Sequence, residues 1–335
     1  MNKVRTIISK YAERAFHCTK RSITEFPHIF TNSKQFGMSL AINSYLIHVA
    51  PTKKRSEKYN DCICQFLENN LSDIIQEGNK REYIVKKIDS LEWPVWICWF
   101  TGIENSPDVV RACFASVQRF LPAWAKIHVI TLNNYSEYFE LPAYCIEKYE
   151  RGVMSAAALS DIFRASLLSK YGGLWLDSTI LACKPISDEI LRSQFFTLRA
   201  HKPLPYWKDP SEGKWCNFIW NTQPDNVLFT FLLNSLLKYW QEYDTVIEYL
   251  LPDYIIKVAY DNIPSVRLML DTFPSNVEDI WLCMRSMGEP FTDKLWAAIE
   301  KNSTFHKLTY KIPWEKVDHT GAKTVFGHIL QTYLK

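Results

Sequence analysis

The sequence predicts an α/β fold in which helices flank a sheet, preceded by a helical extension. Hydrophobic residues follow mainly helical spacing over residues 1–90, whereas residues 95–100 form a continuous apolar run of buried-strand length. After this run, strand-like and helical segments alternate, which is typical of a parallel sheet wound with helices. The length of 335 residues also exceeds the size at which a single hydrophobic core usually stops growing. We therefore expect two units, an extension over residues 1–90 and a main domain over residues 91–335.

The start of the extension is basic, and its apolar residues recur at roughly helical intervals. A basic amphipathic helix of this kind would lie on an anionic membrane surface. Alternatively, the helix would be solvated and would pack its apolar side on the main domain, and the sequence leaves both interpretations open. Before residue 36 the basic residues are Lys3, Arg5, Lys10, Arg14, Lys20, Arg21 and Lys34, against Glu13 and Glu25.

The main domain divides into short apolar segments and longer amphipathic ones. Residues 200–217 form a long connection that holds several aromatic side chains and three prolines. This loop would form part of an acceptor cleft, or its rings would simply pin it to the body of the domain. The expected strands cover residues 94–100, 126–131, 174–176 and 194–198, and the expected helices cover residues 107–120, 156–170, 228–243 and 249–260.

The predicted helix over residues 156–170 carries two opposite charges on one face. Asp161 and Arg164 are three residues apart, so their side chains are neighbours on a helix and can hold one polar ligand together. The alternative is an exposed ion pair, which is common and weak.

Gly172 and Gly173 follow this helix and indicate its end, because glycine adopts positive φ without a Cβ penalty. The next residues form a short apolar strand, and Asp177 follows at its carboxyl end. Ligands of open α/β sheets bind outside the carboxyl ends of strands, so this acid is well placed to meet a phosphate-bound cation. Mg²⁺ or Mn²⁺ would fit, because magnesium needs only one or two protein carboxylates when phosphates complete its shell. Alternatively, Asp177 caps a turn.

Two lysines near the C-terminus are further candidates. Lys307 and Lys311 lie four residues apart, and an extended segment would put them on one face. Their charges would then stabilise a departing diphosphate, although two solvated lysines are an equally good interpretation. His306 and His319 are weaker candidates for additional metal ligands.

Composition excludes several classes of protein. The nine cysteines are an odd number in a chain too large to need disulfides, which favours a reducing compartment. No apolar run reaches the length of a membrane span, and the first residues lack a secretory signal, so we expect a cytoplasmic protein. The formal net charge of +3 argues against nucleic acid as the main partner.

The motif S-D-x-x-R at residues 160–164, followed by Y-G-G-x-W-x-D-x-T at residues 171–179, resembles the capsular polysaccharide synthesis proteins. These are relatives of glycosyltransferase family 32 and, more distantly, of the large clostridial glucosylating toxins. The resemblance covers about residues 91–312. Its other segments are Pro94–Phe100, Asp253–Ile256, Tyr260–Pro264 and His306–Lys311.

The resemblance implies a GT-A fold, a Rossmann-like mixed sheet flanked by helices, and a catalytic site of Asp161, Arg164 and Asp177. By position, Asp161 and Arg164 would bind hydroxyls of the donor sugar, and Asp177 would be the first acid of a metal-binding D-x-D element. The third position of that element is Thr179 here. The resemblance therefore implies a bound Mn²⁺ or Mg²⁺ less strongly than it implies the nucleotide site.

The resemblance also implies further donor contacts. Trp99 at the exit of the first strand would touch the nucleotide base and ribose, and Trp175 is a second candidate for that contact, although strand tryptophans are more often core residues. Asp253 matches the family pattern and would line the site, unless it is a solvated acid on a helix face. Lys307 and Lys311 complete the expected donor site.

We therefore expect a glycosyltransferase that moves a hexose from a UDP-sugar or GDP-mannose to a growing surface glycan. The acceptor would be a glycan or lipid-linked glycan of the capsular or lipopolysaccharide type, reached at the inner face of the membrane. The family usually retains the anomeric configuration. The alternatives are a toxin-like glycosyltransferase that modifies protein, and a non-catalytic module that binds nucleotide sugars or glycans.

Overall fold

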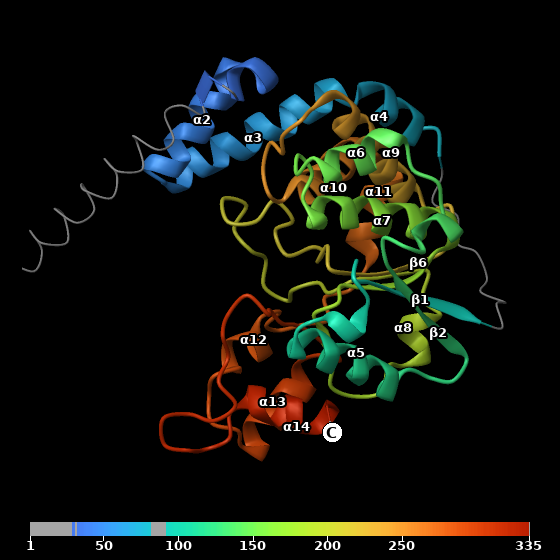
Figure 1. The fold of residues 1–335 in the computed structure, drawn as a ribbon. Helices are drawn as coiled ribbons and strands as arrows, with labels where there is room; N and C mark the ends of the chain where they lie inside the picture. Colours follow the sequence, from blue (N-terminus) through green and yellow to red (C-terminus); the bar gives the residue numbers. More distant parts are fainter. Residues whose placement is uncertain (1–28, 31, 82–91, 335) are drawn as a thin grey trace, which may run out of the picture.

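The computed structural model describes residues 29–30, 32–81 and 92–334. Its centre is a mixed five-stranded sheet with the order β2-β1-β3-β6-β5, covered by helices on both faces (Figure 1). The expected mixed sheet flanked by helices is therefore confirmed. The parallel arrangement that the alternation of segments predicts holds for three of the five strands, and the other two are antiparallel.

The strand β1 (Trp93–Cys98) lies inside the sheet, parallel to both of its neighbours. These neighbours are β2 (Ala125–Ile130) and β3 (Gly173–Leu176). The sheet then reverses direction, since β6 (Ile219–Thr222) is antiparallel to β3 and the short β5 (Phe195–Phe196) is antiparallel to β6.

Both faces of β1 are buried, which explains its continuous apolar sequence. Val95 and Ile97 pack into one hydrophobic core, whereas Trp96 and Cys98 pack into another on the opposite face. A strand that is covered on both faces reads as an unbroken apolar run rather than as an alternating one.

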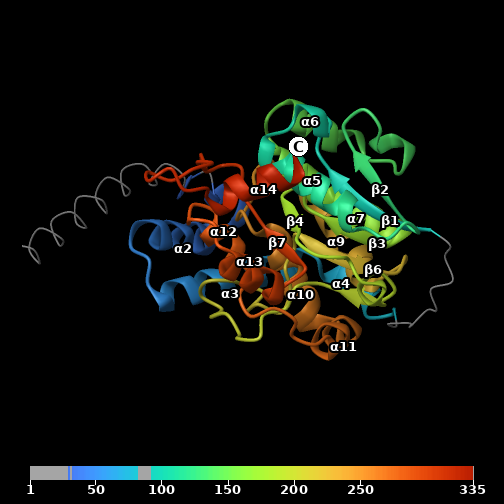
Figure 2. The same cartoon turned by 90° about the horizontal axis from the view of Figure 1, so that it is seen from below.

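The helices form two groups around the sheet (Figures 1 and 2). α7 packs on α9, and α9 packs on α10, so these helices build one layer. On the other side α5 packs against α14 and the strand β4. The bounds are α5 Asp108–Phe120, α6 Ala143–Glu150, α7 Ala156–Tyr171, α8 Asp188–Leu191, α9 Val227–Glu242, α10 Leu251–Asn262, α11 Pro264–Thr272, α12 Leu282–Ser286, α13 Asp293–Asn302 and α14 Val325–Tyr333.

A second, two-stranded sheet joins the C-terminal region to the centre of the chain. β4 (Ile180–Ala182) pairs antiparallel with β7 (Phe305–Lys307), and Ile180 lies opposite Lys307. The Leu308 amide also donates to the carbonyl of Thr179 at 2.9 Å. This pairing brings Lys307 beside the segment that directly follows Asp177.

The described part of the extension consists of α2 (Met38–Val49), α3 (Lys53–Asn70) and α4 (Ser72–Gly78). α3 packs on α10, and α4 packs on α9. Most of the basic segment expected at the N-terminus lies outside the described residues. Among the helices that the structure does describe, none has the length and apolar character needed to cross a bilayer.

Candidate functional site

The first part of the site is the helix α7, which begins and ends as its sequence indicates. The Ser155 hydroxyl accepts from the amide of Ala158 at 3.2 Å and caps the first turn. On one face of this helix the Arg164 guanidinium donates to Asp161, with 2.6 Å between Nη1 and Oδ1. The predicted pairing of Asp161 with Arg164 is therefore present.

Two glycines turn the chain from α7 into β3. Gly172 has φ 64° and Gly173 has φ 97°. A Cβ on Gly173 would lie 2.5 Å from the carbonyl oxygen of Pro94, so the neighbouring strand leaves no room for a side chain. The Trp96 indole fixes the same turn by donating to the carbonyl of Gly172 at 2.7 Å. This tight turn places Asp177 at the carboxyl end of β3, as expected.

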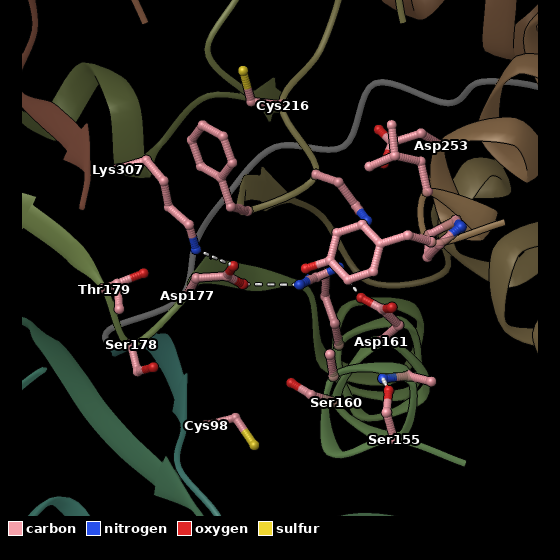
Figure 3. A pocket seen from close by; sticks show the side chains of 18 of the residues that line it. Cys98, Ser155, Ser160, Asp161, Asp177, Ser178, Thr179, Cys216, Asp253 and Lys307 are labelled. Carbon is pink, nitrogen blue, oxygen red and sulfur yellow. Dashed lines mark hydrogen bonds and ion pairs between the residues drawn. The ribbon is translucent and has the colours of Figure 1, made fainter. Parts of the chain in front are cut away.

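Asp177 is the centre of a polar network (Figure 3). Its Oδ1 accepts from Nη2 of Arg164 at 2.8 Å and from the Trp175 indole at 2.9 Å. Its Oδ2 accepts from the Lys307 ammonium at 2.6 Å. The Arg164 guanidinium also lies over the Trp175 ring, 5.0 Å from its centroid. Arg164 thus bridges Asp161 and Asp177, and Lys307 completes a row of alternating charges.

Arg164 at the centre of this network is buried and Asp161 is mostly buried, so the interpretation of Asp161 and Arg164 as an exposed ion pair is wrong. The side chain of Arg164 is only 5% exposed. Burial raises the pKa of Asp161 to about 6, against the opposing effect of the Arg164 charge. Burial would also raise the pKa of Asp177, but Lys307 and Arg164 outweigh it and hold that pKa at about 2. Asp177 is therefore ionised at neutral pH, next to two cations.

The network opens into a cavity of about 800 Å³. Every residue of the expected site lines this cavity: Trp99, Asp161, Arg164, Trp175, Asp177, Asp253, Lys307 and Lys311. The volume falls in the range of clefts that enclose small-molecule ligands.

The expected nucleotide contacts differ in their exposure. Trp99 is partly buried and meets Tyr310 edge to face, with 5.4 Å between ring centroids. Trp175 is only 1% exposed, so it holds Asp177 and Arg164 in place and offers little open ring surface. Lys311 is exposed in the turn after β7, whereas Lys307 belongs to the strand.

Asp253 reaches the cavity from α10 and is buried rather than solvated. Its Oδ1 accepts from the Trp215 indole at 2.9 Å. Burial and the nearby Asp209 carboxylate raise the pKa of Asp253 to about 7. Its charge also interacts with Asp161 and Arg164. Figure 3 shows Asp177 and Asp253 on opposite sides of the drawn residues, so we name an Asp177 end and an Asp253 end of the cavity.

The structure adds aromatic residues that the sequence did not single out. Trp281 and Tyr310 line the cavity and are 38% and 42% exposed, which is unusual for such large rings. Tyr310 falls within the C-terminal motif that carries the resemblance, so the sequence already indicated that this residue could belong to the site. Trp281 lies in a segment without any recognisable motif.

The fit of a divalent cation rests on Asp177. Within the described ranges, no group of three or more His, Cys, Asp and Glu side chains converges as a metal site. Both oxygens of Asp177 are bonded, and a cation at Oδ2 would have to share that oxygen with the Lys307 ammonium or replace it. Both side chains are partly exposed, at 24% for Asp177 and 21% for Lys307. The donor set therefore fits a Mg²⁺ or Mn²⁺ that arrives with substrate phosphates better than a resident ion.

The other candidate metal ligands are placed apart from such a role. His306 is fully buried, its Nε2 is 3.0 Å from the carbonyl oxygen of Ile299, and burial lowers its pKa to about 4. His319 lies exposed in the C-terminal part of the chain. Neither histidine lines the cavity that holds Asp177.

Comparison with known proteins agrees with the family resemblance. The family model described as capsular polysaccharide synthesis protein matches residues 43–329, a wider range than the motifs alone indicated. Among solved structures, the PaToxG glycosyltransferase is similar with 15% identity and a TM-score of 0.41, over 65% of this chain and 82% of its own. No curated protein matches the chain. Because the family match spans most of its length, the chain belongs to the capsular polysaccharide synthesis protein family.

Proposed function

We propose that the protein is a glycosyltransferase that moves a hexose from a nucleotide-sugar donor to a growing surface glycan of the capsular or lipopolysaccharide type. Membership in the capsular polysaccharide synthesis family supports a sugar transferase. The observation that carries the proposal is the charge row of Asp161, Arg164, Asp177 and Lys307 inside one cavity.

The cations of this row suit a donor diphosphate. The Lys307 ammonium is partly exposed and bonded to a single carboxylate oxygen, so a phosphate can share or replace that bond. Arg164 is held rigidly between two acids and over a tryptophan ring. Preorganised charge of this kind stabilises a leaving nucleotide diphosphate in the transition state.

The acids suit the sugar. Carboxylates accept hydrogen bonds from hydroxyl groups, and Asp161 and Asp253 line the cavity beyond Asp177. Asp161 is held by Arg164, and Asp253 is held by Trp215, so neither side chain must be ordered when a sugar binds. We assign the hexose to the space between these two acids.

A divalent cation, Mn²⁺ or Mg²⁺, would bind at Asp177 together with the donor phosphates. Such an ion would neutralise charge that develops on the diphosphate when the anomeric bond breaks. In the retaining reaction that the family resemblance implies, the acceptor hydroxyl enters from the side of the leaving group. A phosphate oxygen of the donor then takes its proton.

The test is turnover of a panel of UDP-sugars and GDP-mannose, with and without Mn²⁺, measured as nucleotide diphosphate release. We expect one donor to be hydrolysed slowly, and we expect Asp177→Ala to abolish that release while the protein stays folded. Asp108→Asn is the matched control, because Asp108 forms an exposed ion pair with Arg111 outside the cavity. Tight binding of nucleotide sugars without turnover would instead indicate a binding module.

A further inference from the structure

The wall at the Asp253 end of the cavity is built from two irregular segments. One is the connection between β5 and β6, which contributes Leu204, Asp209, Ser211 and Trp215 to the lining. The other is the connection between α9 and α10, which contributes Val246, Tyr249 and Leu250. We name these the 204–217 loop and the 246–250 segment. Neither is part of the central sheet, so something else must fix their positions.

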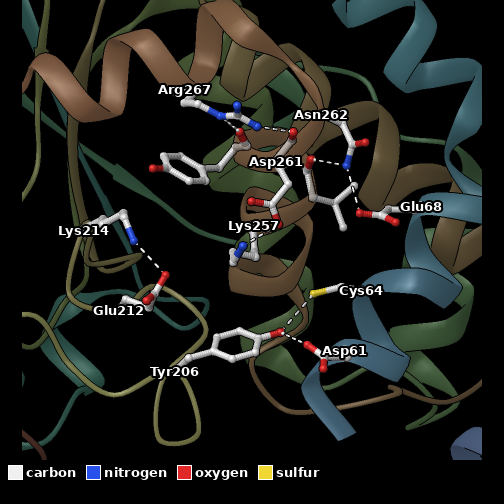
Figure 4. Close-up of polar contacts among 12 residues, drawn as sticks. Asp61, Cys64, Glu68, Tyr206, Glu212, Lys214, Lys257, Asp261, Asn262 and Arg267 are labelled. Carbon is white, nitrogen blue, oxygen red and sulfur yellow. Dashed lines mark hydrogen bonds and ion pairs between the residues drawn. The ribbon is translucent and has the colours of Figure 1, made fainter. Parts of the chain in front are cut away.

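The helix α3 of the extension contacts both segments, and Figure 4 shows its contact with the loop, where Tyr206 meets Asp61 and Cys64. Asn60 donates its amide hydrogen to the carbonyl of Tyr206 in the loop at 2.7 Å. The Tyr206 hydroxyl in turn donates to Asp61 at 3.2 Å. On the other segment, the Tyr59 hydroxyl donates to the carbonyl of Ile247 at 3.2 Å. One turn of α3 therefore holds both parts of the wall.

Asn60 also connects this wall to the helix that carries Asp253. Its side-chain oxygen accepts from the Tyr254 hydroxyl at 2.7 Å, and Tyr254 is the chain neighbour of Asp253. Asn60 is only 5% exposed, and its bond with Tyr254 is buried, whereas its bond to the Tyr206 carbonyl is partly buried. A buried side-chain amide whose N–H and C=O are both hydrogen-bonded holds its partners firmly in place. If these bonds break without access to water, each unpaired polar group costs its desolvation free energy.

The loop is thus fastened on two sides. On the side of the cavity the Trp215 indole donates to Asp253, and on the far side Asn60 joins Tyr206 to Tyr254. No residue of α3 lines the cavity itself. The effect of α3 on a ligand must therefore pass through the loop and α10. The family match begins at residue 43 and includes α3, which agrees with a helix that belongs to the functional unit.

We propose that α3 sets the shape of the acceptor side of the cavity, and that Asn60 is the positioning residue through which it does so. This inference rests on the proposed function, which places the donor diphosphate at the Asp177 end and the donor hexose between Asp161 and Asp253. We assign the acceptor to the wall beyond Asp253, which the 204–217 loop and the 246–250 segment build. The extension is then part of the acceptor site, and removing its contacts loosens acceptor binding while the donor end keeps its geometry.

The first experiment does not depend on enzymatic activity. Hydrogen exchange is compared between wild type and Asn60→Ala, with Lys54→Ala as the control, because Lys54 is exposed on the same helix. We expect about tenfold faster exchange in the 204–217 loop, since Asn60→Ala removes the bond to the Tyr206 carbonyl and the supporting bond to Tyr254. The 246–250 segment should change less, because Tyr59 still donates to the carbonyl of Ile247. Exchange over residues 173–177 should not change. Equal exchange in the loop for Asn60→Ala and wild type would overturn the proposal.

The second experiment separates acceptor from donor. We expect Asn60→Ala to raise the acceptor KM about tenfold with the donor KM within about twofold of wild type, because the wall is loosened while Asp253 keeps its bond to Trp215 and Asp161 keeps its bond to Arg164. Tyr206→Phe loses the hydroxyl contacts with Asp61 and Cys64 but keeps the Tyr206 carbonyl that Asn60 binds. It should raise the acceptor KM by about twofold to threefold, and it serves as the folded variant if Asn60→Ala does not fold. Equal loss of donor and acceptor affinity in Tyr206→Phe would refute the assignment.

The two proposals fail in different ways. If the protein transfers no sugar, the proposed function fails, and the exchange experiment still decides whether α3 holds the wall. If transfer occurs and neither variant changes the acceptor KM, the inference about α3 fails alone.

Discussion

The substitution Arg164→Met tests the buried charge row, because it removes the cation that both acids share. Arg164 donates to Asp161 and to Asp177, and its side chain is 5% exposed. Two unit charges about 4 Å apart attract by ~4 kcal/mol at an effective dielectric constant of about 20. Breaking a buried ion pair by removing one partner costs about 3–5 kcal/mol. We therefore expect Arg164→Met to lower the free energy of unfolding by about 3–5 kcal/mol.

The loss of unfolding free energy in Arg164→Met should depend on pH in a defined direction. The pKa of Asp161 in the folded protein is about 6, above the ordinary value of 3.8, so folding favours its protonated form. Such a group reduces stability as the pH rises from its ordinary pKa toward its folded pKa. Removing Arg164 raises the folded pKa of Asp161 further, because the guanidinium lowers it. The deficit should therefore be smaller at about pH 5.5 than at about pH 8.

The assay is urea unfolding followed by tryptophan fluorescence at both pH values. Arg111→Met is the matched control, because Arg111 forms an exposed helical pair with Asp108. An exposed pair contributes about 0–1 kcal/mol, so the control should unfold almost as the wild type does. If Arg164→Met and Arg111→Met unfold at the same urea concentration, the row does not hold the site together and the reasoning is refuted.

Three further substitutions test separate parts of the site. Lys307→Met should reduce kcat/KM for the donor by about 10–100-fold, because it removes charge that faces the diphosphate, and an unchanged value would contradict that role. Asp253→Asn should reduce the fall in unfolding free energy between pH 3.8 and about 7, because the raised pKa of the wild-type carboxyl makes folding less favourable as the pH rises; Asp161 still contributes a slope up to about pH 6, so a slope in urea titrations equal to that of wild type would count against the assignment. Gly173→Ala should lower the free energy of unfolding by about 3 kcal/mol or more, because a Cβ meets the Pro94 carbonyl at positive φ, and a wild-type unfolding midpoint would show that the turn adapts.

The central part of the fold could be predicted because its signals are local. The spacing of Asp161 and Arg164, the two glycines and the short apolar strand all lie within seventeen residues of sequence, where helix and turn propensities act directly. The position of Asp177 at a strand end followed from the same segment.

The other contacts could not be predicted because they depend on distant pairing. Lys307 reaches Asp177 only because β7 pairs with β4, and nothing in either short strand specifies the other as its partner. The antiparallel β5 and β6 are too short to show their direction in sequence. The contacts of Asn60 with Tyr206 and Tyr254 join segments 146 and 194 residues apart in the chain.

The most direct test of the whole account is a crystal structure of the protein with a non-hydrolysable analogue of its donor sugar nucleotide. We expect the diphosphate to contact Lys307 beside Asp177, and we expect the hexose hydroxyls to contact Asp161 or Arg164. An analogue bound outside this cavity, with the row of Asp161, Arg164, Asp177 and Lys307 unchanged, would contradict the account.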